Sequence, residues 1–242
     1  MPARVKVAVL GQGGRTGGAV ARLCDAAEGF DRLGWSDRNA APQGTEVVID
    51  FSAPAALASQ IGDLAERGVP VVTGTTGLDE AQQARLAAAA TRIPIVQSGN
   101  FSTGVVILAA LVAQASRLLG DDFDIEITET HHKRKKDAPS GTALLLGEAA
   151  AAGRGASLAD AATFARQGND AVRKAGEIGF ATRRGGGVPG DHDVAFLAEE
   201  EVVTLSHRAL NREVFARGAL RAAVWVRTRP PGLYAMTDVL GL

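Results

Sequence analysis

The residue types best suited to chemistry gather between residues 131 and 142, in the run His-His-Lys-Arg-Lys-Lys-Asp-Ala-Pro-Ser-Gly-Thr. Histidine exchanges protons near neutral pH, so His131 and His132 are candidate acid–base groups. Lys135 follows within the same run and brings a positive charge that can hold a carboxylate. The run therefore predicts a site that binds an anionic small molecule and protonates it.

The end of this run reads as the start of a helix. Ser140 is a good helix N-cap, and it follows Pro139 directly. The N–H groups of Gly141 and Thr142 would then open the helix without partners in its first turn. A helix N-terminus beside lysine is suited to a carboxylate or a phosphate.

Three other interpretations of the run remain open. Four consecutive basic residues could form a nucleic-acid patch or a solvated face, but the net charge of −1 shows no wider basic character. A metal site is disfavoured, because adjacent residues of a strand point to opposite faces and would rarely bind one ion. Either histidine could be structural, which suits His132 better than His131.

A second motif, residues 11–17 with the sequence Gly-Gln-Gly-Gly-Arg-Thr-Gly, follows the first apolar run at 5–10. Glycines after a strand and before a helix permit a tight turn and a close approach of the backbone to a pyrophosphate. The helix beyond would contribute its N-terminal N–H groups. The motif predicts dinucleotide binding, and the alternative is a plain glycine-rich turn.

Asp37 lies about 20 residues beyond the glycines, where a carboxylate binds the adenosine ribose hydroxyls. Arg38 could pair with the additional phosphate of NADP. Together they indicate tolerance of both NAD and NADP, although the pair could also belong to a solvated loop.

Two further loops come after predicted strands. Residues 74–77 read Gly-Thr-Thr-Gly and residues 99–102 read Gly-Asn-Phe-Ser. Open α/β sheets bind ligands at the carboxyl ends of their strands, so small and hydroxyl residues there could contact a nicotinamide and its ribose. Ordinary loop chemistry is the alternative. A third segment, 183–192, combines arginines with glycines and could help to hold an anion.

The first hundred residues alternate short apolar strands with alanine-rich helices, which predicts a parallel sheet covered on both faces, a doubly wound α/β domain. The connection 37–46 lacks a crossover helix. The predicted strands are 5–10, 31–36, 47–51, 69–73 and 93–97, and the predicted helices are 15–27, 55–67 and 80–90.

After residue 100 the pattern changes to one of several strands with few helices. It predicts a smaller α+β domain with a mixed or antiparallel open sheet, whose second face needs a cover such as a partner subunit. The segment 149–162 is expected to be a helix end and a surface loop. The predicted helices are 103–119, one from about 141 and 214–226, and the predicted strands are 124–131, 178–183, 193–197 and 202–207.

Composition indicates a globular protein of one or two domains. Of the 242 residues, 46% are hydrophobic and 22% charged, and Cys24 is the single cysteine. A disulfide within the chain and a cysteine-based zinc site are therefore excluded, which suits a reducing cytosol. No secretory leader is evident. The longest apolar run, 104–113, is shorter than a membrane span requires.

The sequence resembles the family of 4-hydroxy-tetrahydrodipicolinate reductases, long called dihydrodipicolinate reductases. The specific match is His131-His132, then Lys135, then residues 137–142, Asp-Ala-Pro-Ser-Gly-Thr. Weaker matches follow in the family's order at 11–17, 50–52, 74–77, 100–105, 184–192, 206–209 and 232–234. Three departures are Thr16, where the family usually has Met, Val106, where it usually has Asn, and the short connection 37–47.

The resemblance implies hydride transfer from NADH or NADPH to a cyclic imine dicarboxylate in lysine biosynthesis, in a cytoplasmic homotetramer without nucleic-acid, membrane or metal partners. It implies a dinucleotide domain of residues 1–102 with 213–242, and a substrate and oligomerisation domain of residues 103–212. His131 and Lys135 resemble the family's proton-transfer residues, and the division of that work between them stays open. His132, Gly141 and Thr142 resemble its substrate contacts. The residues that resemble its cofactor contacts are Gly11, Gln12, Gly13, Gly14, Arg15, Thr16, Asp37, Arg38, Gly74, Thr75, Thr76, Ser98, Gly99, Asn100 and Phe101.

Two rival functions remain. Another Rossmann dehydrogenase, of the homoserine or aspartate type, would share this division of labour but reduce a different carbonyl or imine. A non-catalytic NAD(P)-binding protein would bind the cofactor without turnover, and the joint presence of His131 and Lys135 argues against it.

Overall fold

The chain folds into two compact units, each with its own sheet and core. The structure is a computed structural model, and it describes residues 4–36 and 40–242. Unit 1 comprises Met1–Thr103 and Arg212–Leu242, and unit 2 comprises Gly104–Asn211. These bounds differ by one residue from the predicted ones.

Unit 1 is built on a six-stranded sheet in which all neighbouring strands are parallel. Its central strands are apolar and fully buried, as a sheet covered on both faces requires. The strand order is β11-β5-β4-β3-β1-β2. The strands are β1 (Val5–Leu10), β2 (Phe30–Leu33), β3 (Val47–Asp50), β4 (Val71–Thr73), β5 (Pro94–Gln97) and β11 (Gly232–Tyr234).

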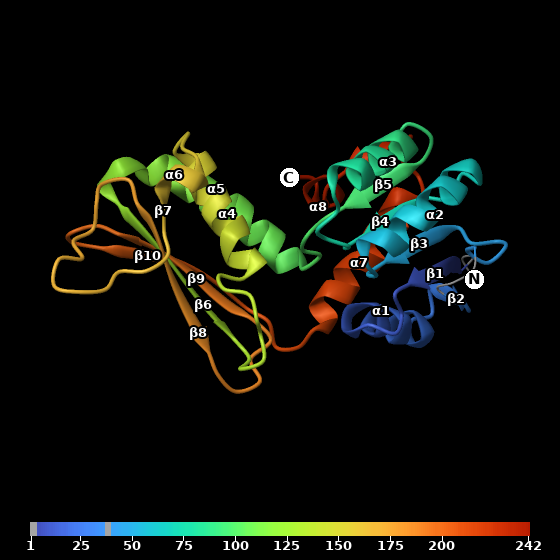
Figure 1. The fold of residues 1–242 in the computed structure, drawn as a ribbon, viewed down its shortest axis with the longest axis horizontal. Coiled ribbons are helices and arrows are strands. Elements are labelled where there is room, and N and C mark those ends of the chain that lie inside the picture. Colours follow the sequence, from blue (N-terminus) through green and yellow to red (C-terminus); the bar gives the residue numbers. More distant parts are fainter. Residues whose placement is uncertain (1–3, 37–39) are drawn as a thin grey trace. The chain divides into compact units, whose positions relative to one another are not determined.

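Helices cover both faces of this sheet (Figure 1). The helix pair α1 and α7 packs on one face, and α2 packs with α3 on the other. The predicted doubly wound domain is therefore confirmed. The helices are α1 (Arg15–Ala26), α2 (Pro54–Glu66), α3 (Glu80–Ala90), α7 (Glu213–Val226) and α8 (Met236–Leu240).

The chain reverses its direction of travel across the sheet at β1. It passes from β1 to β2 on one side, and then to β3 on the other side of β1. Loops that leave β1 and β3 therefore diverge, and open α/β sheets generally bind their ligands at the carboxyl ends of strands at such a point. The described part of the β2–β3 connection, 34–36 and 40–46, contains no helix.

Unit 2 is an α+β unit with a mixed five-stranded sheet of order β10-β9-β6-β8-β7. The pairs β10–β9 and β9–β6 are antiparallel, whereas β6–β8 and β8–β7 are parallel. This confirms the predicted mixed sheet. The strands are β6 (Asp124–His131), β7 (Ala162–Thr163), β8 (Ile178–Arg184), β9 (Asp191–Leu197) and β10 (Val202–Arg208), and the helices are α4 (Thr103–Leu119), α5 (Gly141–Gly153) and α6 (Leu158–Ala161).

The alternation along β6 separates the two faces of this sheet. Ile125 and Ile127 are buried in a core that also contains residues of α4 and α5. Asp124 and Glu126 point to the opposite face, where they are exposed or half-buried. Unit 2 thus has one covered face and one face without helices (Figure 1).

Five small elements differ from the sequence predictions. β2 ends at Leu33 rather than at residue 36, and segment 149–162 contains α6 and the first residue of the two-residue strand β7. β7 exists because Ala162 and Thr163 pair with β8, a long-range contact that local sequence does not encode. β11 and α8 were not predicted, and β11 forms one edge of the sheet by pairing with β5.

The long apolar helix α4 corrects the expectation drawn from run 104–113. With the short 3-10 turn η1 (Gly120–Asp122) it forms a helix of 20 residues. An 18-residue stretch of this helix has a mean hydropathy of 1.6, and 28% of that stretch is buried. By length and composition it could cross a membrane. One such helix is weak evidence, because core helices of globular proteins pass the same test. Leu108 and Val112 do pack in the core of unit 2.

Candidate active site

The glycine turn after β1 packs closely against the start of the β3 loop. Gly11 has a φ of +79°, and a Cβ on it would lie 2.4 Å from the carbonyl oxygen of Phe51. A Cβ on Gly17 would lie 2.2 Å from the carbonyl oxygen of Gly11. By contrast, a Cβ on Gly13 would meet nothing within 4 Å. The turn is therefore tight where it packs and open where a pyrophosphate would approach, so these residues fit a dinucleotide.

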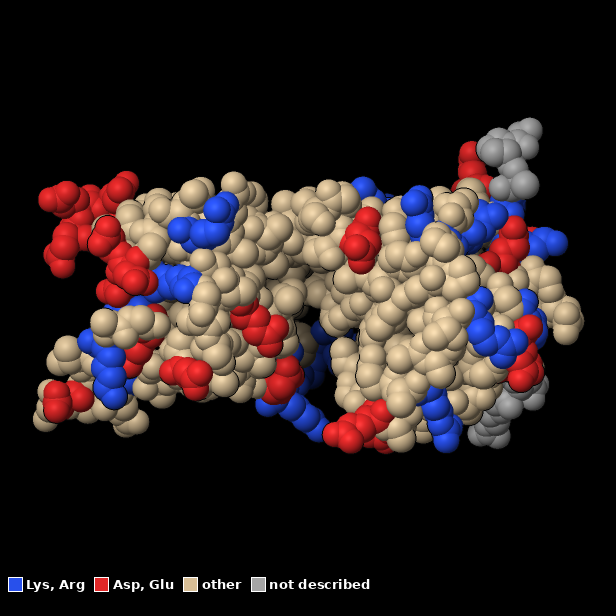
Figure 2. All heavy atoms as spheres, turned by 90° about the horizontal axis from the view of Figure 1, so that it is seen from above, with Lys and Arg blue, Asp and Glu red and all other residues tan. Residues whose placement is uncertain are grey.

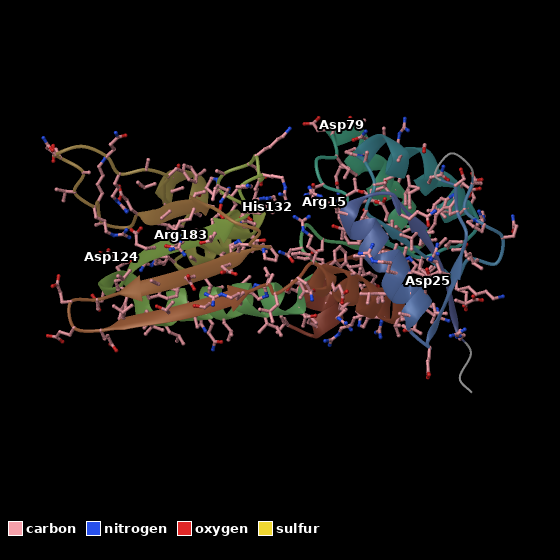
Figure 3. The ribbon with its side chains drawn as sticks, turned by 90° about the horizontal axis from the view of Figure 1, so that it is seen from below. Arg15, Asp25, Asp79, Asp124, His132 and Arg183 are labelled. Carbon is pink, nitrogen blue, oxygen red and sulfur yellow. The ribbon has the colours of Figure 1, made fainter. Side chains whose placement is uncertain are left out.

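Helix α1 begins directly after this turn. Gly14 is its N-cap and makes no side-chain cap hydrogen bond, and Arg15 is exposed at the first helical position. Figure 3 shows Arg15 at this end of the helix and Asp25 toward the other end. The first turn thus combines backbone N–H donors with a cation, and both suit a phosphate.

Gln12 turns its side chain toward β2 rather than toward the open side of the turn. Its amide donates to the carbonyl oxygen of Trp35 at 2.6 Å and accepts from Arg32 at 3.0 Å. Arg32 is held in turn by two hydrogen bonds to Asp25, and that interaction lowers the pKa of the Asp25 carboxyl. Gln12 can therefore contact a cofactor only through its backbone in this arrangement.

A buried carboxylate, Asp50, links the loops that follow β3 and β4. Its oxygens accept from the hydroxyls of Ser52 at 2.5 Å, Thr73 at 2.7 Å and Thr75 at 2.7 Å, and from the Ser52 N–H at 3.0 Å. Asp50 and Thr73 are fully buried. One carboxylate therefore fixes two loops at the carboxyl edge of the sheet.

This network assigns different roles to the residues of the 74–77 loop. Thr75 is buried and uses its hydroxyl to bind Asp50, whereas Thr76 is exposed. Gly74 must lack a side chain, because a Cβ would lie 2.2 Å from the Phe51 ring. The hydroxyl of Thr76 and the backbone of the loop are left to face a ligand.

The loop after β5 is ordered by its own polar groups. Ser98 donates to the carbonyl oxygen of Asn100 at 2.7 Å, and the Asn100 side chain accepts from the Ser102 N–H at 2.8 Å. Gly99 is exposed, but Phe101 is 1% exposed and packs edge-on against Phe51. Phe101 can therefore reach a cofactor only through its backbone. Asp37 and Arg38, the predicted ribose and phosphate contacts, lie outside the described residues.

In unit 2, β6 places Glu129 and His131 two residues apart on the same face of the sheet. The Glu129 carboxylate lies 2.5 Å from Nδ1 of His131, and both side chains are buried. Figure 3 shows Asp124 at the start of this strand and His132 just beyond its other end. The predicted acid–base residue His131 thus has a carboxylate partner.

Several donors hold the Glu129 carboxylate. Arg184 bonds it twice, from Nη1 at 2.8 Å and from Nη2 at 2.7 Å, and the Ser140 N–H donates at 3.0 Å. Burial raises the pKa of Glu129, but the hydrogen bonds from Arg184 and His131 outweigh this and bring the pKa below its usual value. Glu129 therefore carries a negative charge at neutral pH.

The cap of α5 is part of the same cluster. Ser140 accepts from the N–H of Ala143 and lies 3.0 Å from Nε2 of His192. The His192 ring meets that of His131 edge-on, with 5.1 Å between centroids. Burial, and then the nearby charge of His131, lower the pKa of His192 to about 4. His192 is therefore neutral at pH 7, and the predicted N-cap role of Ser140 is confirmed.

The basic loop carries the remaining predicted residues. The Nζ of Lys135 forms an ion pair of 2.7 Å with Asp137, which lowers the pKa of the Asp137 carboxyl. The His132 side chain is buried, and the backbone N–H of His132 donates to the carbonyl oxygen of Val188. Gly141 and Thr142 form the first turn of α5, beside the Ser140 cap. Unit 2 thus brings its predicted catalytic and substrate residues to one end of its sheet.

Sequence reasoning missed the two carboxylates that organise these regions, Glu129 and Asp50. The spacing Glu-x-His on a predicted strand could have revealed the first, because residues two apart share a face. The second gave a weaker signal, since Asp50 ends an apolar strand and is followed at a distance by threonines. Arg184 was noted only as part of a charged turn.

Comparison with known proteins gives a consistent result over the chain. The family model described as "Dihydrodipicolinate reductase, C-terminus" matches residues 104–240, and "Dihydrodipicolinate reductase, N-terminus" matches residues 34–101. The 4-hydroxy-tetrahydrodipicolinate reductase of Caulobacter vibrioides is 50% identical and covers 98% of this chain and 97% of its own length. That of Zymomonas mobilis is 46% identical, with 98% of each chain covered. The solved structure of a dipicolinate-bound dihydrodipicolinate reductase from Paenisporosarcina sp. TG-14 has a TM-score of 0.75 at 21% identity, over 98% of this chain and 99% of its own.

Proposed function

The chain belongs to the dihydrodipicolinate reductase family, and on this premise we propose that it uses His131 and Lys135 to bind and protonate its substrate. The reaction of this family is the NAD(P)H-dependent reduction of 4-hydroxy-tetrahydrodipicolinate, and the chain is an oxidoreductase of this kind in lysine biosynthesis. The observation that carries the residue assignment is the cluster of His131, Lys135 and the N-terminus of α5 at one end of the unit 2 sheet.

Unit 1 supplies the cofactor side of the reaction. A bound nicotinamide cofactor provides the hydride. The glycine turn and the first turn of α1 would hold its pyrophosphate, because they offer a close backbone approach and N–H donors. The loops tied by Asp50 would line the nicotinamide end through Thr76 and backbone groups.

Unit 2 supplies the substrate side. The N–H groups of Gly141 and Thr142 and the Lys135 ammonium would bind the substrate carboxylates, with Lys135 exchanging its partner Asp137 for the substrate. His131, with His132 beside it, would contact the ring and exchange a proton at Nε2. This orientation fixes the ring, and the positive groups stabilise charge that develops during reduction.

Three finer properties belong to the same proposal. The enzyme accepts NADH and NADPH, since Asp37 and Arg38 supply a ribose acceptor and a phosphate partner in the sequence. It works as a homotetramer, because the face of the unit 2 sheet without helices needs a cover and carries exposed residues such as Ala181, Arg183 and Val202. It acts in the cytoplasm.

Nucleic acid is not proposed as a partner. Figure 2 shows basic and acidic side chains interspersed on the face in view, without a continuous basic surface. Lys135 of the basic run is engaged by Asp137. The run therefore suits a small anion better than a polyanion.

The test is nicotinamide oxidation by the purified protein. The unstable substrate is generated in place from pyruvate and aspartate semialdehyde by the preceding synthase, with NADH and NADPH in parallel. Oxidation that depends on the synthase is the expected result. Cofactor binding without oxidation would indicate a non-catalytic binder, and oxidation with another amino-acid precursor would indicate a different dehydrogenase.

A further inference from the structure

We propose that Glu129 is a positioning residue that holds His131 with its Nδ1 hydrogen directed into the carboxylate, so that Nε2 is the atom that exchanges the proton; this rests on the function proposed above for His131. The Nδ1 to Oε2 distance is 2.5 Å. An ionised carboxylate can only accept hydrogen bonds, so Nδ1 must carry the hydrogen. The neutral imidazole is therefore held in the tautomer whose Nε2 has a lone pair.

The carboxylate itself is fixed from two further directions. Arg184 on β8 binds both oxygens of Glu129, in the two-point geometry that gives an arginine–carboxylate pair its specificity. The Ser140 N–H, at the cap of α5, binds Oε1. Glu129 is 1% exposed, so these contacts are made away from solvent. The imidazole of His131 is thus aligned with the helix terminus that would hold the substrate carboxylate.

Two neighbours define the space around the ring. A Cβ on Gly190 would lie 3.0 Å from Nε2 of His131, so the absence of a side chain there leaves room beside the reacting nitrogen. His192 packs edge-on against the His131 ring, with 5.1 Å between the ring centroids. The ring is confined by its neighbours, and Nε2 is the nitrogen that faces the gap left by glycine.

A purely structural role is the competing explanation. The Glu129–Arg184 pair joins β6 to β8, and such a pair could serve only to hold these strands together. The same strand offers a control for this role. Glu126 also pairs with two arginines, Arg166 and Arg173, but on the opposite face of the sheet. Glu126→Gln removes a half-buried pair that links the same strand to neighbouring arginines but lies on the other face from the imidazole.

The experiment compares Glu129→Gln, Glu129→Asp and Glu126→Gln with the wild-type chain. Glutamine keeps the size of the side chain but can present its NH₂ group to Nδ1, which favours the opposite tautomer. We expect Glu129→Gln to lower kcat by about 10²-fold or more with little change in KM, because the group is misdirected while substrate carboxylates are still bound. Glu129→Asp, which keeps the charge, should recover part of the loss, and Glu126→Gln should turn over like wild type.

The second readout is the tautomer itself, recorded by NMR of the full chain labelled with ¹⁵N-histidine. The four histidines are assigned from single variants, with His131→Asn for the signal of interest. Wild type should show hydrogen on Nδ1 of His131, and Glu129→Gln should show it on Nε2 or on both. The double variant Glu129→Gln/Arg184→Gln removes the ion pair as a unit, and should regain folding stability without regaining turnover.

Each outcome separates the two explanations. Unchanged turnover in Glu129→Gln, or lost turnover with the Nδ1 hydrogen still in place, would overturn the positioning role. Recovery of turnover in the double variant would do the same. If the wild-type chain itself fails to oxidise either cofactor, the proposed function fails, while the tautomer measurement still decides the role of Glu129.

Discussion

The two units each contain a buried carboxylate, and the partners of these carboxylates differ in kind. Asp50 in unit 1 is bound by the hydroxyls of Ser52, Thr73 and Thr75 and by a peptide N–H. Glu129 in unit 2 is bound mainly by a guanidinium and an imidazole, with one peptide N–H and a longer contact of 3.4 Å from the Thr182 hydroxyl. Hydroxyls both donate and accept, whereas a guanidinium only donates.

The difference suits the tasks of the two regions. The Asp50 network fixes loop backbones that would lie against a cofactor, and it can readjust its hydrogen bonds when its charge changes. The Glu129 network depends on charge, because the Arg184 guanidinium loses its ionised partner if the carboxylate is neutralised. A buried carboxylate can thus order a binding loop or orient a proton-transfer group, and the kind of donor that binds it differs between these two roles.

The largest expected effect comes from the substrate side. Lys135→Ala should lower turnover by about 10³-fold, because it removes the ammonium that we propose binds the substrate carboxylate. Its effect on cofactor affinity should be small, since Lys135 belongs to unit 2 and the glycine turn to unit 1. The measurement pairs synthase-coupled kinetics with a cofactor titration by fluorescence.

Lys133→Ala is the matched control, because Lys133 is an exposed lysine of the same loop. It should retain turnover. Equal losses in the two variants would mean that the general positive charge of the loop matters rather than the Lys135 position.

The next effect tests the two carboxylates directly. Glu129→Gln should cost about 3–5 kcal/mol of unfolding free energy, because it leaves the Arg184 guanidinium without its charged partner in a buried site. Asp50→Asn should cost only about 1–2 kcal/mol, because threonine and serine hydroxyls can accept from the new amide. Scanning calorimetry and urea unfolding followed by circular dichroism would measure both. A larger loss of unfolding free energy for Asp50→Asn than for Glu129→Gln would contradict the proposed difference between the two networks.

A pH effect of about 2–3 kcal/mol is expected from His192. Its pKa in the folded chain is about 4, below the ordinary value of 6.5, because burial disfavours the charged ring. The unfolded chain therefore binds this proton more readily, and stability falls as pH drops from 6.5 toward 4. Urea unfolding at pH 7.5 and 4.5 should show a steeper loss for wild type than for His192→Gln. Parallel losses would show that His192 takes no part in the pH dependence.

The sequence predicted those features that local pattern controls. Alternation along β6 and the apolar runs of β1 and β3 gave strands and their faces, and Ser140 after Pro139 gave the start of α5. The pairings that depend on distant residues were not accessible. β7 and β11 are short strands that exist because β8 and β5 offer edges to pair with.

The same distinction between local pattern and distant contacts applies to the residues of the candidate site. Glycine spacing and the His-His-Lys run identified residues that later proved to lie at strand ends and at a helix start. The use of particular side chains did not follow from spacing. The Thr75 hydroxyl is used by Asp50, and the Gln12 amide is bound to Trp35 and Arg32. These hydrogen bonds join residues that are 20 or more positions apart in the sequence, so a local motif does not predict them.

The smallest expected effect contrasts two glycines, one from each region. A Cβ on Gly190 would press on Nε2 of His131 at 3.0 Å, a contact that a small ring displacement can relieve. Gly190→Ala should therefore lower kcat by about tenfold and leave cofactor affinity unchanged. A Cβ on Gly11 would lie 2.4 Å from the backbone oxygen of Phe51, and the positive φ of Gly11 disfavours any residue with a side chain. Gly11→Ala should therefore weaken cofactor binding and lower stability.

Gly187→Ala and Gly29→Ala are the matched controls, since a Cβ on either would meet nothing within 4 Å. Both should fold like wild type. The decisive readout is which constant changes in each region, measured as kcat for Gly190→Ala and as the cofactor Kd for Gly11→Ala. The methyl group of Gly190→Ala would press on His131, so an unchanged kcat would mean that displacing this ring does not limit the reaction. A changed cofactor Kd with an unchanged kcat would therefore assign Gly190 to cofactor binding rather than to proton exchange.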